Sequence, residues 1–232
     1  MLSTALAARF ASEMCNNVGN NKYLPTLFME SNRASPIEQR ILNLAKSQST
    51  IRTRDAIAGG IHPEDLRRLV DRGVLLKSGR GMYTYIDAEL TEYHSLAVAS
   101  QRVDRGVICL LSALQFHGIG TQAPFEVWVA IDVHARRPNS DVLSLRPVYM
   151  SGLALSAGIE THAIEGTPVR IFTPAKTIVD CFKYRHKIGL DVALEALRES
   201  WESRRCSMDE LWEYSKICRM SKVMRPYLEY LS

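Results

Sequence analysis

The stretch from Ile61 to Tyr85 constrains the fold more than any other part of the chain, because a short helix is followed directly by two strands. The helix is expected from Pro63 to Arg72, since proline fits a first helical turn, acidic residues follow it, and a glycine comes after the last turn. Two strands, 74–77 and 82–85, are joined by a glycine-rich turn that carries one arginine. We therefore expect a helix followed by a hairpin with a basic tip.

Two further helices are predicted upstream of this stretch. The segment Ser35-Pro36-Ile37-Glu38 has the pattern of a capping box, and the helix it begins runs to about Gln48. Thr53 is expected to cap a second helix, Arg54 to Ala58, which two glycines end as a tight turn. The order helix, helix, turn, helix and hairpin is that of a winged helix-turn-helix, which we expect over residues 35–90 and interpret as a DNA-binding domain.

The charge distribution favours this interpretation. Residues 35–86 carry a net charge of +4, whereas the first 34 residues carry +1 and residues 87–232 carry −1. A positive excess within the helix-hairpin domain is what binding to a phosphate backbone requires.

The cations of this domain are the candidate contacts to double-stranded DNA. Arg67 and Arg68 lie off the apolar stripe of their helix, and arginine suits the two acceptors of guanine in the major groove. The hairpin cations suit phosphate or the minor groove, and the arginines at the start of the second helix suit the backbone. Glu64 and Asp65 would repel phosphate, and the alternative interpretation is a solvated face with ion pairs. The predicted DNA-binding residues are Arg52, Arg54, His62, Arg67, Arg68, Lys77 and Arg80.

The rest of the chain predicts an α+β fold: an N-terminal winged helix-turn-helix followed by a mixed α/β C-terminal domain that ends in helices. Residues 1–34 are expected to be a partly disordered arm with one short helix near residues 2–14. In the C-terminal domain, residues 91–232, strands are expected at 125–131, 143–149, 159–164 and 169–172. Helices are expected at 93–102, 107–117, 174–184, 190–201, 208–218 and 223–231.

No catalytic, metal or cofactor site is predicted. The five cysteines are odd in number, far apart and without a CxxC pair, which is typical of idle thiols in a reducing cytoplasm. The six histidines lack metal-binding spacing, and Lys176 is expected at the surface or in a helix-capping position. No apolar run approaches the ~20 residues of a membrane span, and the N-terminus lacks a clear targeting signal.

Several segments, taken in their order and spacing, resemble the AbiEi-type antitoxins, the transcriptional regulators of type IV toxin–antitoxin systems. The resemblance covers roughly residues 36–230 and rests on Leu66-Arg-Arg-Leu-Val70, Gly73-Val-Leu75, Arg80-Gly-Met-Tyr83, Ser112-Ala-Leu114 with His117-Gly118, Phe125–Ile131 and Thr173–Asp180. It implies an autorepressor that binds inverted repeats in its own promoter and counteracts a nucleotidyltransferase-like toxin through its C-terminal domain. Two alternatives stay open. One is a winged-helix protein-interaction module that acts through its C-terminal domain without specific DNA binding, and the other, less favoured, is a nucleic-acid-processing enzyme.

Overall fold

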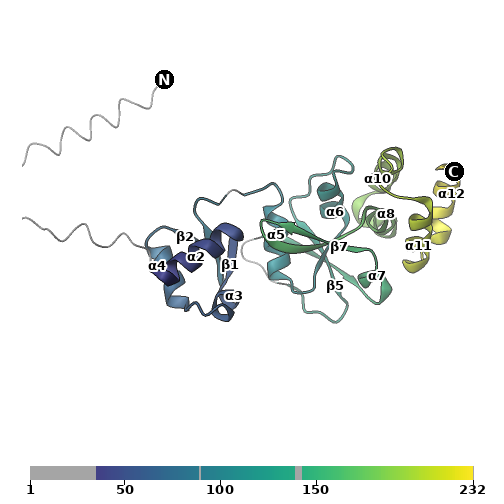
Figure 1. The fold of residues 1–232 in the computed structure, drawn as a ribbon. Coiled ribbons are helices and arrows are strands. Elements are labelled where there is room, and N and C mark those ends of the chain that lie inside the picture. Colours follow the sequence, from purple (N-terminus) through teal and green to yellow (C-terminus); the bar gives the residue numbers. More distant parts are fainter. Residues whose placement is uncertain (1–34, 89, 139–142, 232) are drawn as a thin grey trace, which may run out of the picture. The chain divides into compact units, whose positions relative to one another are not determined.

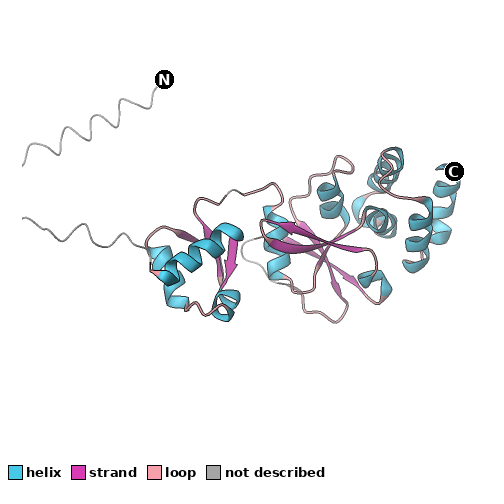
Figure 2. Cartoon of the chain, in the orientation of Figure 1, coloured by secondary structure: helices cyan, strands magenta, loops and turns pink. Residues whose placement is uncertain are grey.

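The computed structural model describes residues 35–88, 90–138 and 143–231, and the chain from Pro36 onward forms one compact unit. The N-terminal arm and the helix expected near residues 2–14 lie outside the described residues. Within the described part, helices and strands alternate in a mixed α+β arrangement, as the sequence predicts (Figures 1 and 2).

Residues 36–85, which we call the N-terminal module, contain three helices and a three-stranded antiparallel sheet. The module's apolar side chains, among them Ile41, Leu66 and Leu75, form a cluster of their own. The sheet has the order β1-β3-β2, so Thr50–Arg52, for which the sequence predicts no strand, is an edge strand. The elements are α2 (Pro36–Ser47), β1 (Thr50–Arg52), α3 (Thr53–Ala58), α4 (Pro63–Asp71), β2 (Leu75–Gly79) and β3 (Met82–Tyr85).

The remaining residues, 90–231, which we call the second domain, are built on a five-stranded mixed sheet with helices on both faces (Figure 1). Helix α5 (His94–Arg102) packs on one face, where its apolar side chains join those of Ile108, Val129 and Ile171. The other face is covered by later helices of the chain. The strands are β4 (Val107–Ile108), β5 (Val127–Asp132), β6 (Leu145–Met150), β7 (Ile159–Ile164) and β8 (Thr167–Phe172), in the order β6-β5-β4-β8-β7.

The helical layer centres on α8 (Pro174–Lys183), which contacts α6, α10, α11 and α12 and whose residues 175–182 are all buried. Thr173 caps this helix and proline occupies its first turn, as the sequence predicts. The short helices α7 and α9 were not predicted. The remaining helices are α6 (Leu110–His117), α7 (Leu153–Ser156), α9 (Arg185–Ile188), α10 (Leu190–Glu202), α11 (Met208–Ile217) and α12 (Ser221–Leu231).

The predicted helix over residues 107–117 is wrong in its first turn. Val107 and Ile108 form the central strand β4, which pairs with β5 on one side and with β8 on the other. Both residues are buried, and a short apolar run of β-branched residues fits a central strand as well as a helix. The chain turns at Leu110, whose φ is +48°, and only then becomes helical.

Lys176 is buried rather than at the surface or in a capping position, so that expectation is wrong. Its side chain is fully inaccessible, as is that of Asp180 one turn later, and the Lys176 Nζ–Asp180 Oδ2 distance is 2.5 Å. The ammonium also lies 4.2 Å from the centre of the Phe172 ring. Cys218 Sγ donates to the other oxygen of Asp180 at 3.5 Å. The helix is covered by neighbouring helices, so a lysine and an aspartate four residues apart can pair only with each other inside the layer.

Breaking this pair should destabilise the second domain. Replacing Lys176 with Met leaves an uncompensated buried carboxylate, and we expect a loss of about 3–5 kcal/mol in the free energy of unfolding. The double variant Lys176→Met/Asp180→Leu removes both charges and should recover most of that loss. Urea unfolding followed by circular dichroism measures both, with the exposed Lys187→Met as control. Equal stabilities of the single and double variants would contradict the assignment.

Candidate nucleic-acid interface

Helix α4 presents a charged face to solvent and an apolar face to the module's core. Leu66 and Leu69 are buried, whereas Arg67 and Arg68 are exposed. His62, the residue before the helix, is the N-cap, and its Nδ1 accepts a hydrogen bond from the Glu64 backbone N–H at 3.3 Å. The structure therefore gives His62 a local capping role at the exposed start of the helix. Its predicted contact with DNA would have to form while Nδ1 keeps this capping hydrogen bond.

A concavity of about 490 Å³ lies between α4 and the β2–β3 hairpin. Arg67 and Lys77 both line it, together with the ring of Tyr83. Glu64 and Asp71 also line this concavity, so acidic and basic groups alternate along it. The structure thus brings together two of the predicted DNA contacts, one from the helix and one from the hairpin, and places two carboxylates beside them.

Two other predicted contacts lie apart from this concavity. Arg68 is 67% exposed and lies 3.5 Å from Asp65 Oδ1, one turn earlier on the same helix. Such a surface pair contributes ~1 kcal/mol or less, so a phosphate can replace the carboxylate at small cost. Arg80 is exposed at the hairpin tip, and its carbonyl oxygen accepts a hydrogen bond from Arg102 Nη1 at 3.1 Å.

Arg52 and Arg54 are engaged within the chain. Arg54 donates two hydrogen bonds to the carboxylate of Asp104, at 2.8 and 2.7 Å. Arg52 donates to the carbonyl of Gln101 at 2.6 Å and to Asp55 at 2.8 Å. The hydrogen bonds from Arg54 hold the pKa of Asp104 below its usual value, and the same contact raises the pKa of Arg54. These two arginines connect the module to the end of α5.

Glu165 makes a second connection between the module and the second domain, and sequence reasoning missed it. Its side chain is 2% exposed. One carboxylate oxygen accepts from Ser49 Oγ of the module and lies 2.7 Å from His94 Nδ1. The other oxygen accepts from the backbone N–H and the hydroxyl of Thr91, at 2.8 and 3.0 Å.

The backbone at Glu165 supports a specific role for this side chain. Its φ is +50°, in the left-handed region, and Gly166 follows with φ +72° in the turn between β7 and β8. Asparagine or glycine fits such a turn better than glutamate does. Burial acts to raise the pKa of Glu165, but the hydrogen bonds from Ser49, His94 and Thr91 outweigh it, and the pKa is lowered.

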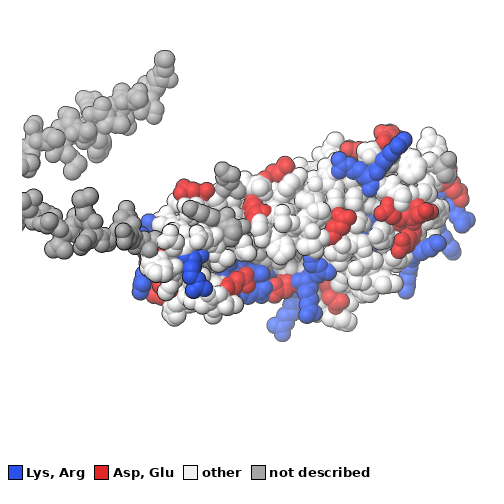
Figure 3. Space-filling model, viewed as in Figure 1, with Lys and Arg blue, Asp and Glu red and all other residues white. Residues whose placement is uncertain are grey.

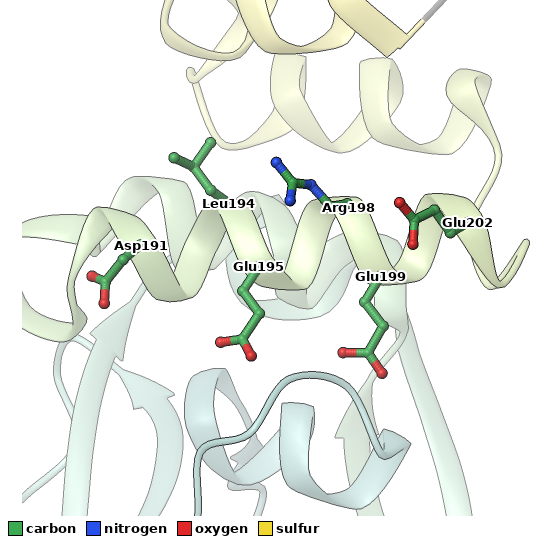
Figure 4. A pocket seen from close by; sticks show the side chains of 6 residues that line it. All are labelled: Asp191, Leu194, Glu195, Arg198, Glu199 and Glu202. Carbon is green, nitrogen blue, oxygen red and sulfur yellow. The ribbon is translucent and has the colours of Figure 1, made fainter.

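An acidic row on α10 could suggest paired catalytic carboxylates, but its contacts indicate a structural role (Figure 4). Glu195 and Glu199 point toward the loop that follows α6, where Glu199 accepts from the Gly120 N–H at 2.6 Å and Glu195 from the Thr121 hydroxyl at 3.0 Å. Among the described residues, no three His, Cys, Asp or Glu side chains are grouped to hold a metal ion. In the same part of the chain, no helix is long and apolar enough to cross a membrane.

Comparison with known families bears on the N-terminal module. Residues 39–86 match the model of a family described as transcriptional regulator, AbiEi antitoxin. This segment is therefore similar to the AbiEi family. The resemblance inferred from the sequence is confirmed over this segment, which spans almost the whole module. The family's description is that of a regulator rather than of an enzyme.

Comparison with whole proteins and solved structures gives information on the fold. A search of curated proteins finds no match. Among solved structures, the chain is similar to the crystal structure of the RV2827C protein from Mycobacterium tuberculosis, with a TM-score of 0.53 and 15% sequence identity. The similarity covers 80% of this chain and 73% of that one. At this identity the likeness concerns the fold alone, and it extends well beyond the AbiEi segment.

The buried carboxylate of Glu165 generates a pH-dependent prediction. Replacing Glu165 with Gln should lower the free energy of unfolding at pH 7 by about 1–3 kcal/mol. The hydrogen bonds to the charged carboxylate become weaker when a neutral amide takes its place. The pKa of Glu165 is lower in the folded protein than its usual 4.5, so its contribution is complete above that value and is lost as the pH falls through the lowered pKa.

Urea unfolding at a series of pH values tests this prediction. The difference between Glu165→Gln and the parent protein should shrink in acid, while Glu160→Gln, an exposed change in the same hairpin, should have little effect at any pH. A difference of the same size at every pH would contradict the role assigned to the carboxylate.

Proposed function

We propose that the N-terminal module is a winged helix-turn-helix that binds double-stranded DNA and that the chain represses its own promoter as an antitoxin. In this proposal α4 is the recognition helix and the β2–β3 hairpin is the wing. Residues 35–90 form the DNA-binding domain, and residues 91–232 form the domain that counteracts a nucleotidyltransferase-like toxin. The DNA site consists of inverted repeats upstream of the chain's own reading frame.

One observation carries the DNA-binding part of the proposal. Arg67 of α4 and Lys77 of the hairpin line the same concavity, so cations from two elements face one space. A helix side chain can then read a base edge while the hairpin cation holds a phosphate, which is the division of labour that sequence-specific binding requires. The AbiEi match over residues 39–86 supports the same conclusion, since that family is described as one of transcriptional regulators.

The remaining candidate residues differ in how freely they could reach DNA. Arg68 and Arg80 are exposed and would add contacts beside the concavity. Arg54 would reach the DNA backbone only after exchanging Asp104 for a phosphate. Arg52 would also have to give up its bonds to Asp55 and to the Gln101 carbonyl. His62 would contribute from the exposed N-cap.

A second candidate function is favoured by the acidic groups on α4. Glu64 and Asp71 flank Arg67 in the concavity, and alternating charges suit a protein surface better than a phosphate backbone. The module would then be a protein-interaction surface, and the chain would act through its second domain without specific DNA binding. Figure 3 shows acidic and basic groups interleaved on the visible face, rather than one uniformly basic surface. Tight binding to a toxin without any DNA shift at low salt would favour this candidate.

The recognition helix can be tested directly with two alanine substitutions. Arg67→Ala/Arg68→Ala should lower the affinity for the chain's own upstream DNA by about 10–100-fold, because base contacts by arginine are lost. Fluorescence anisotropy with a labelled duplex measures this, and Arg198→Ala/Lys222→Ala, two exposed cations of the second domain, removes the same charge elsewhere. Unchanged binding by the first variant would refute α4 as the recognition helix.

The hairpin should behave differently from the helix. Lys77→Ala should weaken binding to specific and unrelated duplexes by similar factors and reduce the slope of log affinity against log salt by about one, because a phosphate contact is lost. A loss confined to the specific duplex would contradict the assignment of Lys77 to the backbone.

Asp104 tests the proposed role of Arg54. Replacing Asp104 with Asn removes a negative charge and weakens the hold on Arg54, whereas Arg52 keeps its bonds to Gln101 and Asp55, so the affinity for duplex DNA at low salt should rise by roughly threefold to tenfold. Glu213→Gln, an exposed change on α11, is the control of equal charge. If Asp104→Asn binds DNA no better than this control, Arg54 does not belong to the DNA interface.

A further inference from the structure

The second domain contains a cavity of about 760 Å³ whose basic residues have no role in the proposed DNA-binding surface. It opens where α5 ends and where β5 leads into the loop of residues 133–138. Five arginines line it, contributed by the end of α5, the loop before β4, the loop after β5, and β8. We call this cavity the arginine pocket, and its arginines are Arg102, Arg105, Arg136, Arg137 and Arg170.

The charge of the arginine pocket is largely uncompensated. Among the described residues, none of the five guanidinium groups takes part in a salt bridge. Arg170 donates to the carbonyl of Arg105 and Arg102 Nη1 to the carbonyl of Arg80, both at 3.1 Å, so in the described part of the chain these two guanidinium groups have neutral partners only. Five guanidinium groups without a carboxylate partner among these residues make the potential in this space positive, so the pocket favours an anion.

Two carboxylates also line the pocket, but they do not neutralise it. Asp104 is engaged by two hydrogen bonds from Arg54. One oxygen of Asp132 accepts from the His134 backbone N–H at 2.9 Å, which leaves the other oxygen able to accept from a hydroxyl group.

The pocket also has an apolar wall. Val103 and Ile131 are buried, and Leu155 lines the pocket beside them. A concave space of this volume, with an apolar wall and convergent polar groups, is typical of a small-molecule site. Planar guanidinium groups bind phosphate oxygens in pairs, which makes arginine the preferred residue for phosphate recognition.

We infer that the arginine pocket binds a phosphorylated small molecule of the nucleotide class. The arginines hold the phosphates, the apolar wall covers the base, and Asp132 accepts from a sugar hydroxyl. A DNA duplex fits these observations less well, because the arginines converge from four segments on one concave space instead of following an exposed ridge. The inference does not depend on DNA binding by the N-terminal module.

Isothermal titration of the full-length protein with ATP, ADP and AMP at low salt tests this inference. We expect saturable binding that strengthens with the number of phosphates, because several guanidinium groups face the pocket. Arg136→Ala/Arg137→Ala should weaken ATP binding by at least about tenfold, since charge-assisted hydrogen bonds are lost. Both residues are exposed, so folding should be unaffected, which circular dichroism checks.

The control is Arg198→Ala/Lys222→Ala, which removes two exposed cations from α10 and α12 and should leave ATP binding unchanged. The same proteins are titrated with inorganic phosphate and with an unrelated duplex. Absence of ATP binding, or equal weakening by both double variants, would overturn the inference. So would a result in which Arg136→Ala/Arg137→Ala impairs only duplex binding, because the pocket would then belong to a DNA interface.

Discussion

Two carboxylates of the second domain, Asp104 and Glu165, receive most of the side-chain hydrogen bonds that reach across from the N-terminal module. The apolar cluster of the module shares no residue with the two clusters of the second domain, so polar contacts hold this junction. Gln101 adds to it by donating to the carbonyl of Thr50 at 3.2 Å. Polar contacts of this kind orient one part against another, as in many contacts between domains. The position of α4 and the hairpin therefore depends on groups far from them in the sequence.

The local elements could be predicted because their signals are local. Pro63 and the glycine after Arg72 bound α4, and alternation of β-branched residues marks β5. Thr173 and Pro174 similarly mark the start of α8. The central strand β4 could not be told from a helix, since two buried apolar residues carry no period. Its identity depends on β5 and β8, which pair with it from later in the chain.

The candidate sites likewise combine features that local sequence predicts with features that depend on distant parts of the chain. That Arg67 lies off the apolar stripe follows from helical spacing, but its meeting with Lys77 depends on how the hairpin folds back. Lys176 and Asp180 are four residues apart, which predicts pairing but not burial, since burial is decided by the helices that cover α8. The sequence offers one weak indication of the role of Glu165, which is a glutamate at a position where a tight turn would favour asparagine. The sequence does not indicate the arginine pocket, because its arginines come from four segments of the chain.

Asp104 belongs to both proposed sites, so binding at one site should affect binding at the other. The sign of this coupling follows from the charges. It lines the arginine pocket and also holds Arg54, a candidate for the DNA backbone. A phosphate bound beside Asp104 brings a like charge near its carboxylate, which makes the pairing with Arg54 more favourable. Occupation of the pocket then opposes the release of Arg54 to DNA, so nucleotide and DNA weaken each other's binding by the same factor. The exposure of both side chains, 57% for Arg54 and 62% for Asp104, keeps this coupling to about 1 kcal/mol or less, and salt screens it further.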